Sequence, residues 1–295
     1  MDHFQEYLAT EVALDHAGGQ LTRREALRRL GMMGLSLTAA SALLAACGDD
    51  GEETTGPAAQ ATTTAAPAVS TTRPVTTPVP TQDITYPGPN GTLMGAYAAA
   101  ASPKGAVVVV HENRGLTDNI KAVAGRLAGD GYSALAVDLL SERGGTAAVP
   151  AAEVGASLPG PDRIRPDLRA TIDELVKRNP RAKVGMIGFC FGGTVVWDFL
   201  TEDEPRLAAA APFYGTTPAD VTFRSKAAVF GVYGETDARV NATRDGAKAN
   251  LERAGLPHEI KTYAGVGHGF YSRVETEQSQ QAYSDTLNWF DRYLR

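Results

Sequence analysis

Short apolar runs alternate with longer amphipathic segments from residue 83 to the end of the chain. The short runs predict strands, and a run as rich in valine as 105–111 (GAVVVVH) is typical of a strand buried on both faces. The longer segments carry apolar residues at helical spacing and predict helices that cover the sheet. This alternation predicts an α/β fold: a mostly parallel central sheet, flanked by helices on both faces, in a single compact domain. Strands are predicted at 105–111, 132–138, 184–189, 208–214, 227–233 and 259–263, and helices at 119–130, 167–177, 194–200 and 275–294, with a Gly/Pro-rich loop over 139–166.

The first 46 residues differ from the rest of the chain. A cluster of arginines, which includes Arg23 and Arg24, precedes an apolar and uncharged run over 30–46, and an export signal is built in this way. The arginine pair resembles a twin-arginine signal, with Ala26 at the position where that signal usually has a large apolar residue. The run is rich in small residues and is barely long enough to cross about 30 Å of hydrocarbon. We therefore expect residues 1–46 to be a cleaved export signal rather than a permanent transmembrane helix.

The apolar run ends in LAAC (44–47), which resembles a bacterial lipobox. On that interpretation the Cys47 thiol carries a diacylglycerol. Residues 47–82 are dominated by Thr, Ala and Pro and have almost no large apolar side chain, so they cannot bury enough surface to fold. We expect a lipid anchor at Cys47, a disordered tether to residue 82 and one folded domain over 83–295. The protein would then be exported and anchored to the outer face of the bacterial cytoplasmic membrane.

Composition and cysteine content exclude several classes of function. The 295 residues include 28 basic and 34 acidic side chains, a net charge of -6, and no basic stripe interleaved with aromatic residues, so we expect no nucleic-acid partner. The chain has two cysteines. If Cys47 is lipidated, Cys190 has no partner within the chain, which rules out a disulfide framework and leaves an unpaired thiol outside the cytoplasm. We expect a monomer that acts on a small molecule.

Cys190 lies in the sequence GFCFGG (188–193), after a predicted strand and before a predicted helix. Small residues allow the chain to turn sharply there and to project residue 190 from the end of the sheet, as in the nucleophile elbow of α/β-hydrolases. The N-terminal end of the following helix would stabilise a thiolate, and the backbone N–H of Phe191 would donate to an oxyanion. The alternative is that Cys190 is a small buried side chain that only packs.

Two further residues support the catalytic interpretation. Asp237 follows the strand predicted at 227–233, and His268 lies in a glycine-rich loop after the strand predicted at 259–263. Nucleophile, acid and histidine therefore occur in the order that α/β-hydrolases use. His268 would take the thiol proton and later return it, while Asp237 would hold the imidazole in the productive tautomer. Taken alone, Asp237 could instead be a helix cap and His268 a satisfied loop histidine.

A carboxylate follows the valine-rich strand, where hydrolases of this fold place the loop with the second oxyanion donor. It belongs to Glu112, in the sequence HENRG (111–115). Together with the GFCFGG turn, Asp237 and the sequence GHGF (267–270), Glu112 resembles the motif set of the dienelactone hydrolase family, the carboxymethylenebutenolidases. The resemblance covers 83–295 and implies an α/β-hydrolase fold in which Glu112 contacts the thiol and helps to deprotonate it. It also implies that the N–H of Asn113 joins that of Phe191 in the oxyanion hole. A surface ion pair of Glu112 with Arg114 is the alternative.

The same resemblance directs attention to arginines that could hold a substrate. Family members that act on dienelactone bind its carboxylate with arginines, one of them shortly after the catalytic histidine, and Arg273 lies near that place in this chain. Its spacing from His268 is one residue longer than the family's usual four. Arg163 or Arg165 could supply a second arginine, and Tyr214 is a candidate wall of the pocket.

A metal site is not expected. His111 opens a His-Glu pair, but a zinc motif of that kind needs histidine at position 115, which is Gly115, so we expect no metal and no cofactor. We expect a hydrolase that opens small lactones or cleaves activated carboxylic esters through a Cys190–His268–Asp237 triad and a thioester acyl-enzyme. The alternatives are a general carboxylesterase of unknown acyl preference and a lipoprotein that binds a ligand on the same scaffold without turnover.

Overall fold

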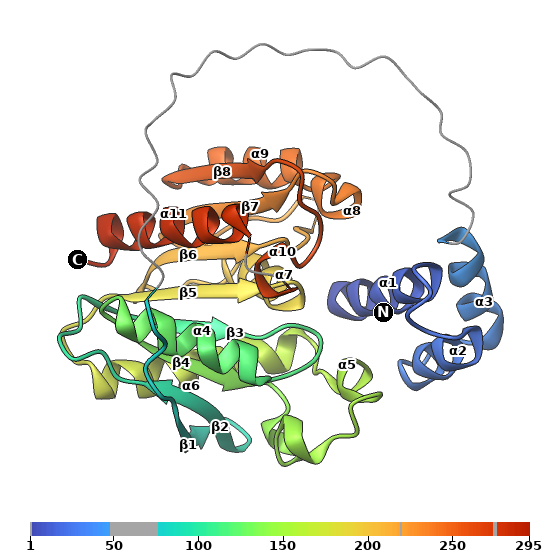
Figure 1. Cartoon of the computed structure of the whole chain (residues 1–295), viewed down its shortest axis with the longest axis horizontal. Helices are drawn as coiled ribbons and strands as arrows, with labels where there is room; N and C mark the ends of the chain where they lie inside the picture. Colours follow the sequence, from blue (N-terminus) through green and yellow to red (C-terminus); the bar gives the residue numbers. More distant parts are fainter. Residues whose placement is uncertain (1, 48–75, 219, 274–275) are drawn as a thin grey trace, which may run out of the picture.

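An eight-stranded sheet forms the centre of the protein (Figure 1). The computed structural model describes residues 2–47, 76–218, 220–273 and 276–295, and of residues 272 and 273 it describes the backbone alone. The strand order is β1-β2-β4-β3-β5-β6-β7-β8. Neighbouring strands from β4 to β8 are parallel, whereas β2 pairs antiparallel with both β1 and β4. The strands are β1 Gln82–Gly88, β2 Gly91–Ala98, β3 Gly105–Val110, β4 Tyr132–Asp138, β5 Val184–Phe189, β6 Leu207–Phe213, β7 Ala228–Gly234 and β8 His258–Tyr263.

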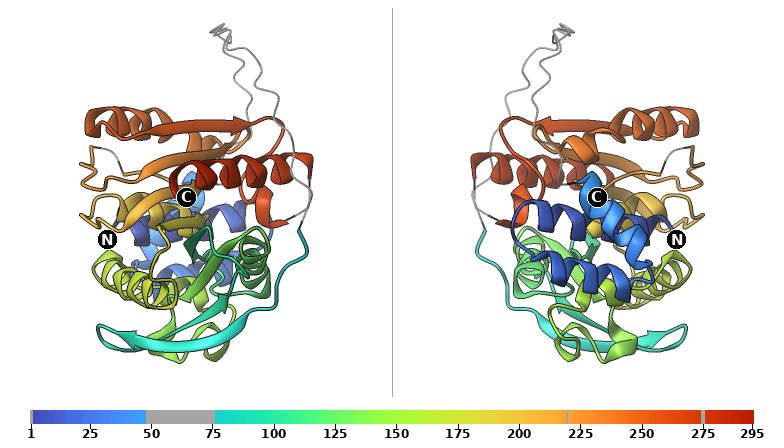
Figure 2. Two further views of the ribbon diagram at one scale, coloured as in Figure 1. Left: turned by 90° about the vertical axis from the view of Figure 1, so that its left-hand side faces the viewer. Right: turned by 90° about the vertical axis from the view of Figure 1, so that its right-hand side faces the viewer.

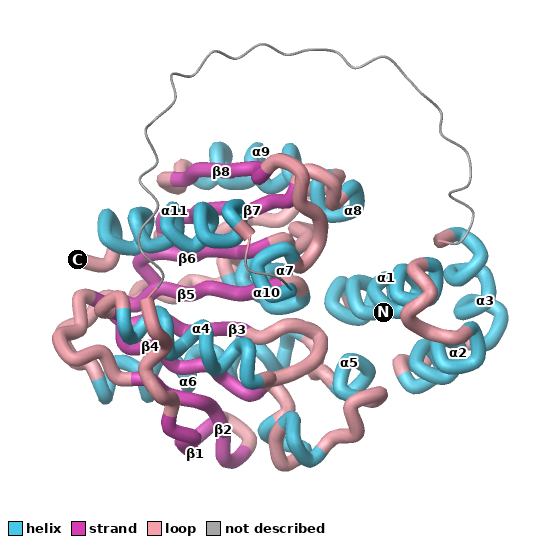
Figure 3. The backbone as a smooth tube through the Cα atoms, in the orientation of Figure 1, coloured by secondary structure: helices cyan, strands magenta, loops and turns pink. Residues whose placement is uncertain are grey.

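Helices cover both faces of this sheet (Figure 3). On one face α4 and α11 lie together, and the hydroxyl of Tyr283 in α11 donates a hydrogen bond of 2.8 Å to Asp130 at the end of α4. On the other face α6 packs against α7. Every residue of β3 and β5 is buried, which explains why these strands are almost wholly apolar. The helices of this domain are α4 Asp118–Gly129, α5 Val154–Ser157, α6 Pro161–Arg178, α7 Phe191–Phe199, α8 Ala238–Asn241, α9 Arg244–Ala254, α10 Phe270–Arg273 and α11 Glu277–Tyr293, with short 3₁₀ turns η1 Ser141–Arg143 and η2 Thr146–Ala148.

The predicted strands and helices are all present, with two differences of substance. Helix α6 begins at Pro161, so the expectation that Arg163 and Arg165 lie in a loop is wrong. Pro161 occupies the first turn, where a missing N–H leaves no partner unsatisfied, and the helix continues through Pro166. The β1–β2 hairpin was not predicted from the sequence. Its turn contains Gly91 at φ 130, a value that favours glycine.

Residues 3–46 form three helices that pack against one another, α1 His3–Ala17, α2 Arg23–Met32 and α3 Leu37–Ala46. They share a small apolar core that includes Val12, Leu30 and Leu44. This helical unit lies at the edge of the sheet where the parallel strands end, and the right-hand view of Figure 2 places it in front of the domain. Helix α1 is the part that packs on α7.

The segment expected to be an export signal corresponds to this helical unit. Arg23 and Arg24 begin α2, and the apolar run over 30–46 is interrupted after Met33, because Gly34 adopts φ 87 before α3 begins. None of the described helices combines enough length with enough apolar content to cross a bilayer. Cys47 caps the C-terminal end of α3 and its thiol is free. Residues 48–75, most of the expected tether, lie outside the described residues.

Candidate active site

Cys190 occupies a strained turn between β5 and α7. Its φ of 55 is a left-handed value that a residue with a side chain rarely adopts, and it is held there by hydrogen bonds from its own N–H to the Phe213 carbonyl and from the Thr194 N–H to its carbonyl, both 3.1 Å. The two glycines after it are needed because neighbouring backbone comes very close. A Cβ on Gly192 would lie 2.3 Å from the Val110 carbonyl oxygen, and one on Gly193 would lie 2.3 Å from that of Phe213.

The Phe191 N–H lies at the first turn of α7, directly after Cys190. This is the position that donates to an oxyanion in α/β-hydrolases, and the helix also directs its positive end toward the sulfur. The sequence prediction of a sharp turn that projects residue 190 from the sheet is therefore matched by the backbone. Cys190 is 4% exposed.

His268 and Asp237 form a close pair at the ends of neighbouring strands. His268 Nδ1 lies 2.6 Å from Asp237 Oδ2, which fixes the Nδ1–H tautomer and leaves Nε2 for the other side of the ring. The second oxygen of Asp237 accepts from the Val240 N–H at 3.3 Å, so this residue also caps α8. The two interpretations of Asp237, helix cap and partner of His268, thus describe the same carboxylate.

The charge of His268 is set by its neighbours. Burial alone would lower the pKa of this imidazole, but the Cys190 sulfur, the hydrogen bond with Asp237 and the nearby Glu11 carboxylate raise it well above its ordinary value. His268 therefore keeps its proton to a higher pH than a free imidazole does.

Glu112 and Asn113 line the same cavity of about 280 Å³ as Cys190 and His268. Their loop is fixed by His111, which is fully buried. Its Nδ1 lies 2.7 Å from the Glu112 carbonyl oxygen, and its Nε2 accepts from the Leu139 N–H at 3.1 Å. Burial lowers the pKa of His111, so it stays neutral and serves as a structural link between the ends of β3 and β4.

Tyr214 is in contact with the ring of His268. Its ring packs edge to face against the imidazole at 5.2 Å between centroids, and its backbone adopts a positive φ of 37. Tyr214 is fully buried, so in this structure it fixes the histidine and does not line the cavity around Cys190.

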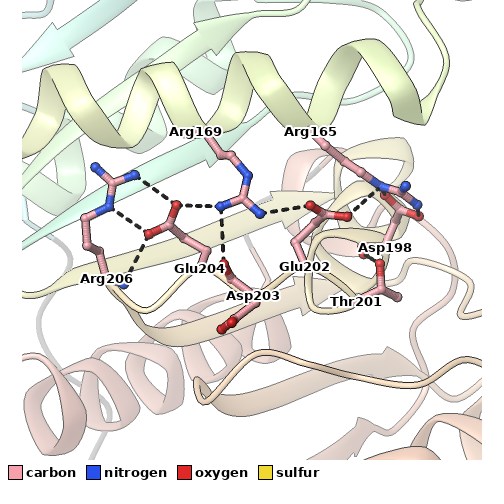
Figure 4. Close-up of polar contacts among 8 residues, drawn as sticks. All are labelled: Arg165, Arg169, Asp198, Thr201, Glu202, Asp203, Glu204 and Arg206. Carbon is pink, nitrogen blue, oxygen red and sulfur yellow. Dashed lines mark hydrogen bonds and ion pairs between the residues drawn. The ribbon is translucent and has the colours of Figure 1, made fainter.

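The arginines suggested for substrate binding are engaged in ion pairs elsewhere. Arg163 contacts Glu142 and also Asp167, whereas Arg165 holds Asp198 through two hydrogen bonds of 2.8 and 2.6 Å. Figure 4 shows Arg165 within a row of alternating charges between α6 and the segment after α7. Neither arginine lines the cavity around Cys190. The side chain of Arg273 lies outside what the structure describes.

Comparison with known proteins decides the family to which this chain belongs. The family model described as "Dienelactone hydrolase family" matches residues 93–294. The chain belongs to the dienelactone hydrolase family. It is therefore a hydrolase of carboxylic esters with the α/β-hydrolase fold.

The relatives of this dienelactone hydrolase family member match its domain rather than its N-terminal segment. "Protein usf" of Aquifex pyrophilus is 29% identical over 70% of this chain and 96% of its own. A Synechocystis protein that carries the provisional name carboxymethylenebutenolidase is 28% identical over 72% of this chain and 94% of its own. Among solved structures, a dienelactone hydrolase-like promiscuous phosphotriesterase from metagenomic libraries has a TM-score of 0.63 at 22% identity, covering 74% of this chain and 100% of that one.

The N-terminal helix α1 reaches the candidate catalytic residues Cys190 and His268, a contact that sequence reasoning missed. The Tyr7 hydroxyl lies 3.3 Å from Cys190 Sγ, and Glu11 Oε1 lies 4.0 Å from His268 Nε2. Arg239 of α8 binds the Glu11 carboxylate, and its guanidinium lies over the Tyr7 ring at 4.4 Å. The sequence signal that could have indicated Arg239 is its position, because it places a positive charge two residues after Asp237.

A metal could be considered at the same place. Among the described residues, Glu11, Cys190 and His268 offer one oxygen, one sulfur and one nitrogen that all lie within 4.8 Å of one another. These are the atoms that form the charged cluster at the catalytic pair. Glu11 is already paired with Arg239 and His268 with Asp237, and the absence of a metal stays a prediction.

Proposed function

We propose that the protein opens small lactones or cleaves activated carboxylic esters with Cys190 as nucleophile, His268 as base and acid, and Asp237 as the residue that orients the histidine. The observation that carries the proposal is the pairing of His268 Nδ1 with Asp237 at 2.6 Å while His268 and Cys190 line one cavity. Nucleophile, base and orienting acid are the parts that this chemistry requires.

The reaction would begin with attack of the thiolate on the substrate carbonyl carbon. The resulting oxyanion would accept hydrogen bonds from the N–H groups of Phe191 and Asn113. As the C–O bond to the leaving group breaks, His268 gives its Nε2 proton to the leaving oxygen, and a thioester on Cys190 remains. Water, deprotonated by His268, then attacks the thioester and releases the acid and the free thiolate.

Glu112 has a separate role in this proposal. It lines the cavity beside Cys190 and His268, and the resemblance to family members implies that it helps to deprotonate the thiol when substrate binds. The Glu112 carboxylate would also repel the negative charge that develops at the oxyanion hole. We therefore expect the Glu112 side chain to move away from that position as the substrate enters.

The test is hydrolysis of p-nitrophenyl acetate and cis-dienelactone by residues 76–295, wild type beside Cys190→Ala. We expect turnover by the wild-type domain but none by its Cys190→Ala variant above the uncatalysed rate. Undiminished turnover by Cys190→Ala would refute the mechanism. Absence of turnover in every protein, with binding of the lactone retained, would favour the non-catalytic lipoprotein, and turnover of the ester without the lactone would favour a general carboxylesterase.

We further propose that the protein is exported as a monomer and anchored to the outer face of the bacterial cytoplasmic membrane by lipid on Cys47. The support is the order of arginine pair, apolar run and LAAC sequence. Metabolic labelling with palmitate should depend on Cys47 and persist in Cys190→Ala. Equal labelling of Cys47→Ala would remove the lipid anchor from the account.

A further inference from the structure

The catalytic residues of this protein are covered by its own N-terminal helix. Tyr7 is 3% exposed and Cys190 is 4% exposed, because the tyrosine hydroxyl lies against the sulfur on which a substrate carbonyl would have to arrive. Burial, with the Cys190 sulfur and Glu11 close by, raises the pKa of Tyr7 well above its ordinary value. The phenol therefore keeps its proton, and its hydroxyl stays in contact with the sulfur.

Two further contacts place α1 over the nucleophile. The Phe4 ring packs edge to face on Phe191, the residue whose N–H would hold the oxyanion, at 5.3 Å between centroids. His3 Nε2 lies 3.2 Å from Asp198, a carboxylate that Arg165 also binds. The helix is thus fixed at its N-terminal end, at the oxyanion position and at the nucleophile.

Glu11 makes the contact that a substrate anion would make. Its carboxylate is bound by Arg239, lies 4.0 Å from His268 Nε2 and has an oxygen within 4.8 Å of the Cys190 sulfur. The Arg239 side chain is largely buried, and its Nε has no hydrogen-bond partner among the described residues, so it has a further donor to offer. A guanidinium that already binds a carboxylate within 4.8 Å of the Cys190 sulfur, and that has a free donor, is suited to a planar substrate carboxylate at the same place.

We propose that Arg239 is the binding position for a carboxylate on the substrate, and that Glu11 fills this position in the full chain, so that α1 blocks the active site as an internal substrate analogue. The inference rests on the proposed function, and the resemblance to the family implies a substrate with a carboxylate; what is new is the residue that would hold it and the helix that occupies its place. It assigns the anion contact to α8 rather than to the arginines of α6.

The charge of the remaining cavity agrees with a blocked state. With α1 docked, the cavity beside Cys190 is lined by the carboxylates of Glu11, Asp15 and Glu112, of which α1 supplies two, and by the cationic groups of Arg114 and His268. The three carboxylates outnumber the two cations, so a carboxylated substrate would be repelled there. When α1 leaves, two of these negative charges leave with it and Arg239 loses its carboxylate partner. Cleavage before Cys47, as proposed above, would remove α1 from the mature protein and open the site.

The first experiment tests the anion position with two p-nitrophenyl esters that have acyl chains of the same length, the succinate half-ester and the butyrate. It uses residues 76–295, because relatives that match this part consist of almost nothing else and therefore show that the domain folds alone. For Arg239→Met we expect the ratio of kcat/KM for the succinate half-ester to kcat/KM for the butyrate to fall by about tenfold or more. Arg239→Lys should retain part of the preference, since it keeps the charge. An unchanged ratio in Arg239→Met would overturn the assignment, whatever happens to the absolute rates.

The second experiment tests the block by α1 through alkylation of Cys190 with iodoacetamide, followed by mass spectrometry of the peptide that carries it. This readout needs no turnover. We expect residues 76–295 to react about tenfold faster or more than the full chain, and Glu11→Gln in the full chain to recover much of that difference. Glu6→Gln, an exposed change on the same helix, should not.

The two outcomes separate this inference from the proposed function. Equal alkylation of the full chain and residues 76–295, or a lower kcat/KM after α1 is removed, would overturn the block and indicate that α1 completes the substrate pocket instead. Slower alkylation of the full chain together with no hydrolysis of any ester by residues 76–295 would support docking of α1 but refute the proposed function and, with it, the assignment of a substrate carboxylate to Arg239.

Discussion

The Tyr7 hydroxyl lies 3.3 Å from the sulfur of Cys190, although the two residues are 183 positions apart in the sequence. One belongs to a helix that precedes the hydrolase domain, and the other is the proposed nucleophile of that domain. This contact explains why the thiol is almost inaccessible even though it lies at the end of the sheet, where substrates of α/β folds bind.

Replacing Tyr7 with alanine should expose the thiol. The phenol ring covers the sulfur, so we expect Tyr7→Ala to raise the rate of Cys190 alkylation in the full chain by roughly tenfold. Circular dichroism of the variant should match the wild type, because α1 retains its own packing against α2 and α3. An alkylation rate that matches the wild type would show that Tyr7 does not protect the thiol.

Replacing Asp237 with asparagine should affect both rate and stability. Turnover should fall by at least about 100-fold, because the imidazole loses the carboxylate that fixes its tautomer. The pKa of His268 in the folded protein is raised above its unfolded value of about 6.5, so this group stabilises the fold fully below that pH, and the stabilisation is lost as the pH rises through the folded pKa. The difference in free energy of unfolding between wild type and Asp237→Asn, measured by urea denaturation, should therefore be largest below about pH 6.5 and shrink at higher pH. A difference that grows with pH would contradict the charge assigned to His268.

The turn that carries Cys190 should not tolerate a side chain at Gly192. Its Cβ would meet the backbone carbonyl oxygens of Val110 at 2.3 Å and His111 at 2.6 Å, so β3 and the turn would have to separate. We expect Gly192→Ala to lower the free energy of unfolding by about 2 to 3 kcal/mol and to abolish turnover. Gly246→Ala is the control, because its Cβ would meet nothing within 4 Å inside α9, and it should stabilise by about 0.5 to 1 kcal/mol. Similar stability changes in the two variants would mean that close packing is not what requires glycine at 192.

Arg165 should matter for stability rather than for substrate preference. Its partner Asp198 has a side chain that is only 3% exposed, and without the guanidinium it would keep His3 as its remaining ionic contact. We expect Arg165→Met to lower the free energy of unfolding by about 3 kcal/mol. Thermal denaturation measures this loss. A selective loss of the succinate half-ester over the butyrate, with stability unchanged, would return Arg165 to the list of substrate contacts.

The sequence predicted most strands of the domain, because the pattern of apolar residues along the chain indicates which segments are buried. Valine-rich runs such as β3 are strands because both faces are covered. Cys190, Asp237 and His268 could be proposed as a site because each follows a predicted strand, although β8, the strand before His268, is only partly buried. The glycines around Cys190 were also informative, since only glycine fits where backbone approaches so closely.

The sequence could not predict the contacts of α1. Residues 1–46 carry the features of an export signal, and nothing in their periodicity indicates that Tyr7 and Glu11 face a cysteine far along the chain. Arg239 was missed for a related reason, because its partner is supplied by that helix. The start of α6 was misplaced, because the Gly/Pro-rich composition up to residue 166 predicts a loop, whereas a proline at the first turn favours a helix.

The most direct test of the account is to capture the acyl-enzyme. Residues 76–295 are mixed with p-nitrophenyl acetate, quenched with acid within one turnover, digested and analysed by mass spectrometry. The account predicts an acetyl group on the peptide that contains Cys190, which accumulates in the burst phase and then decays, and no such group in Cys190→Ala. A burst of p-nitrophenol with the acetyl group on another residue, or an equal burst from Cys190→Ala, would contradict the claim that Cys190 is the nucleophile.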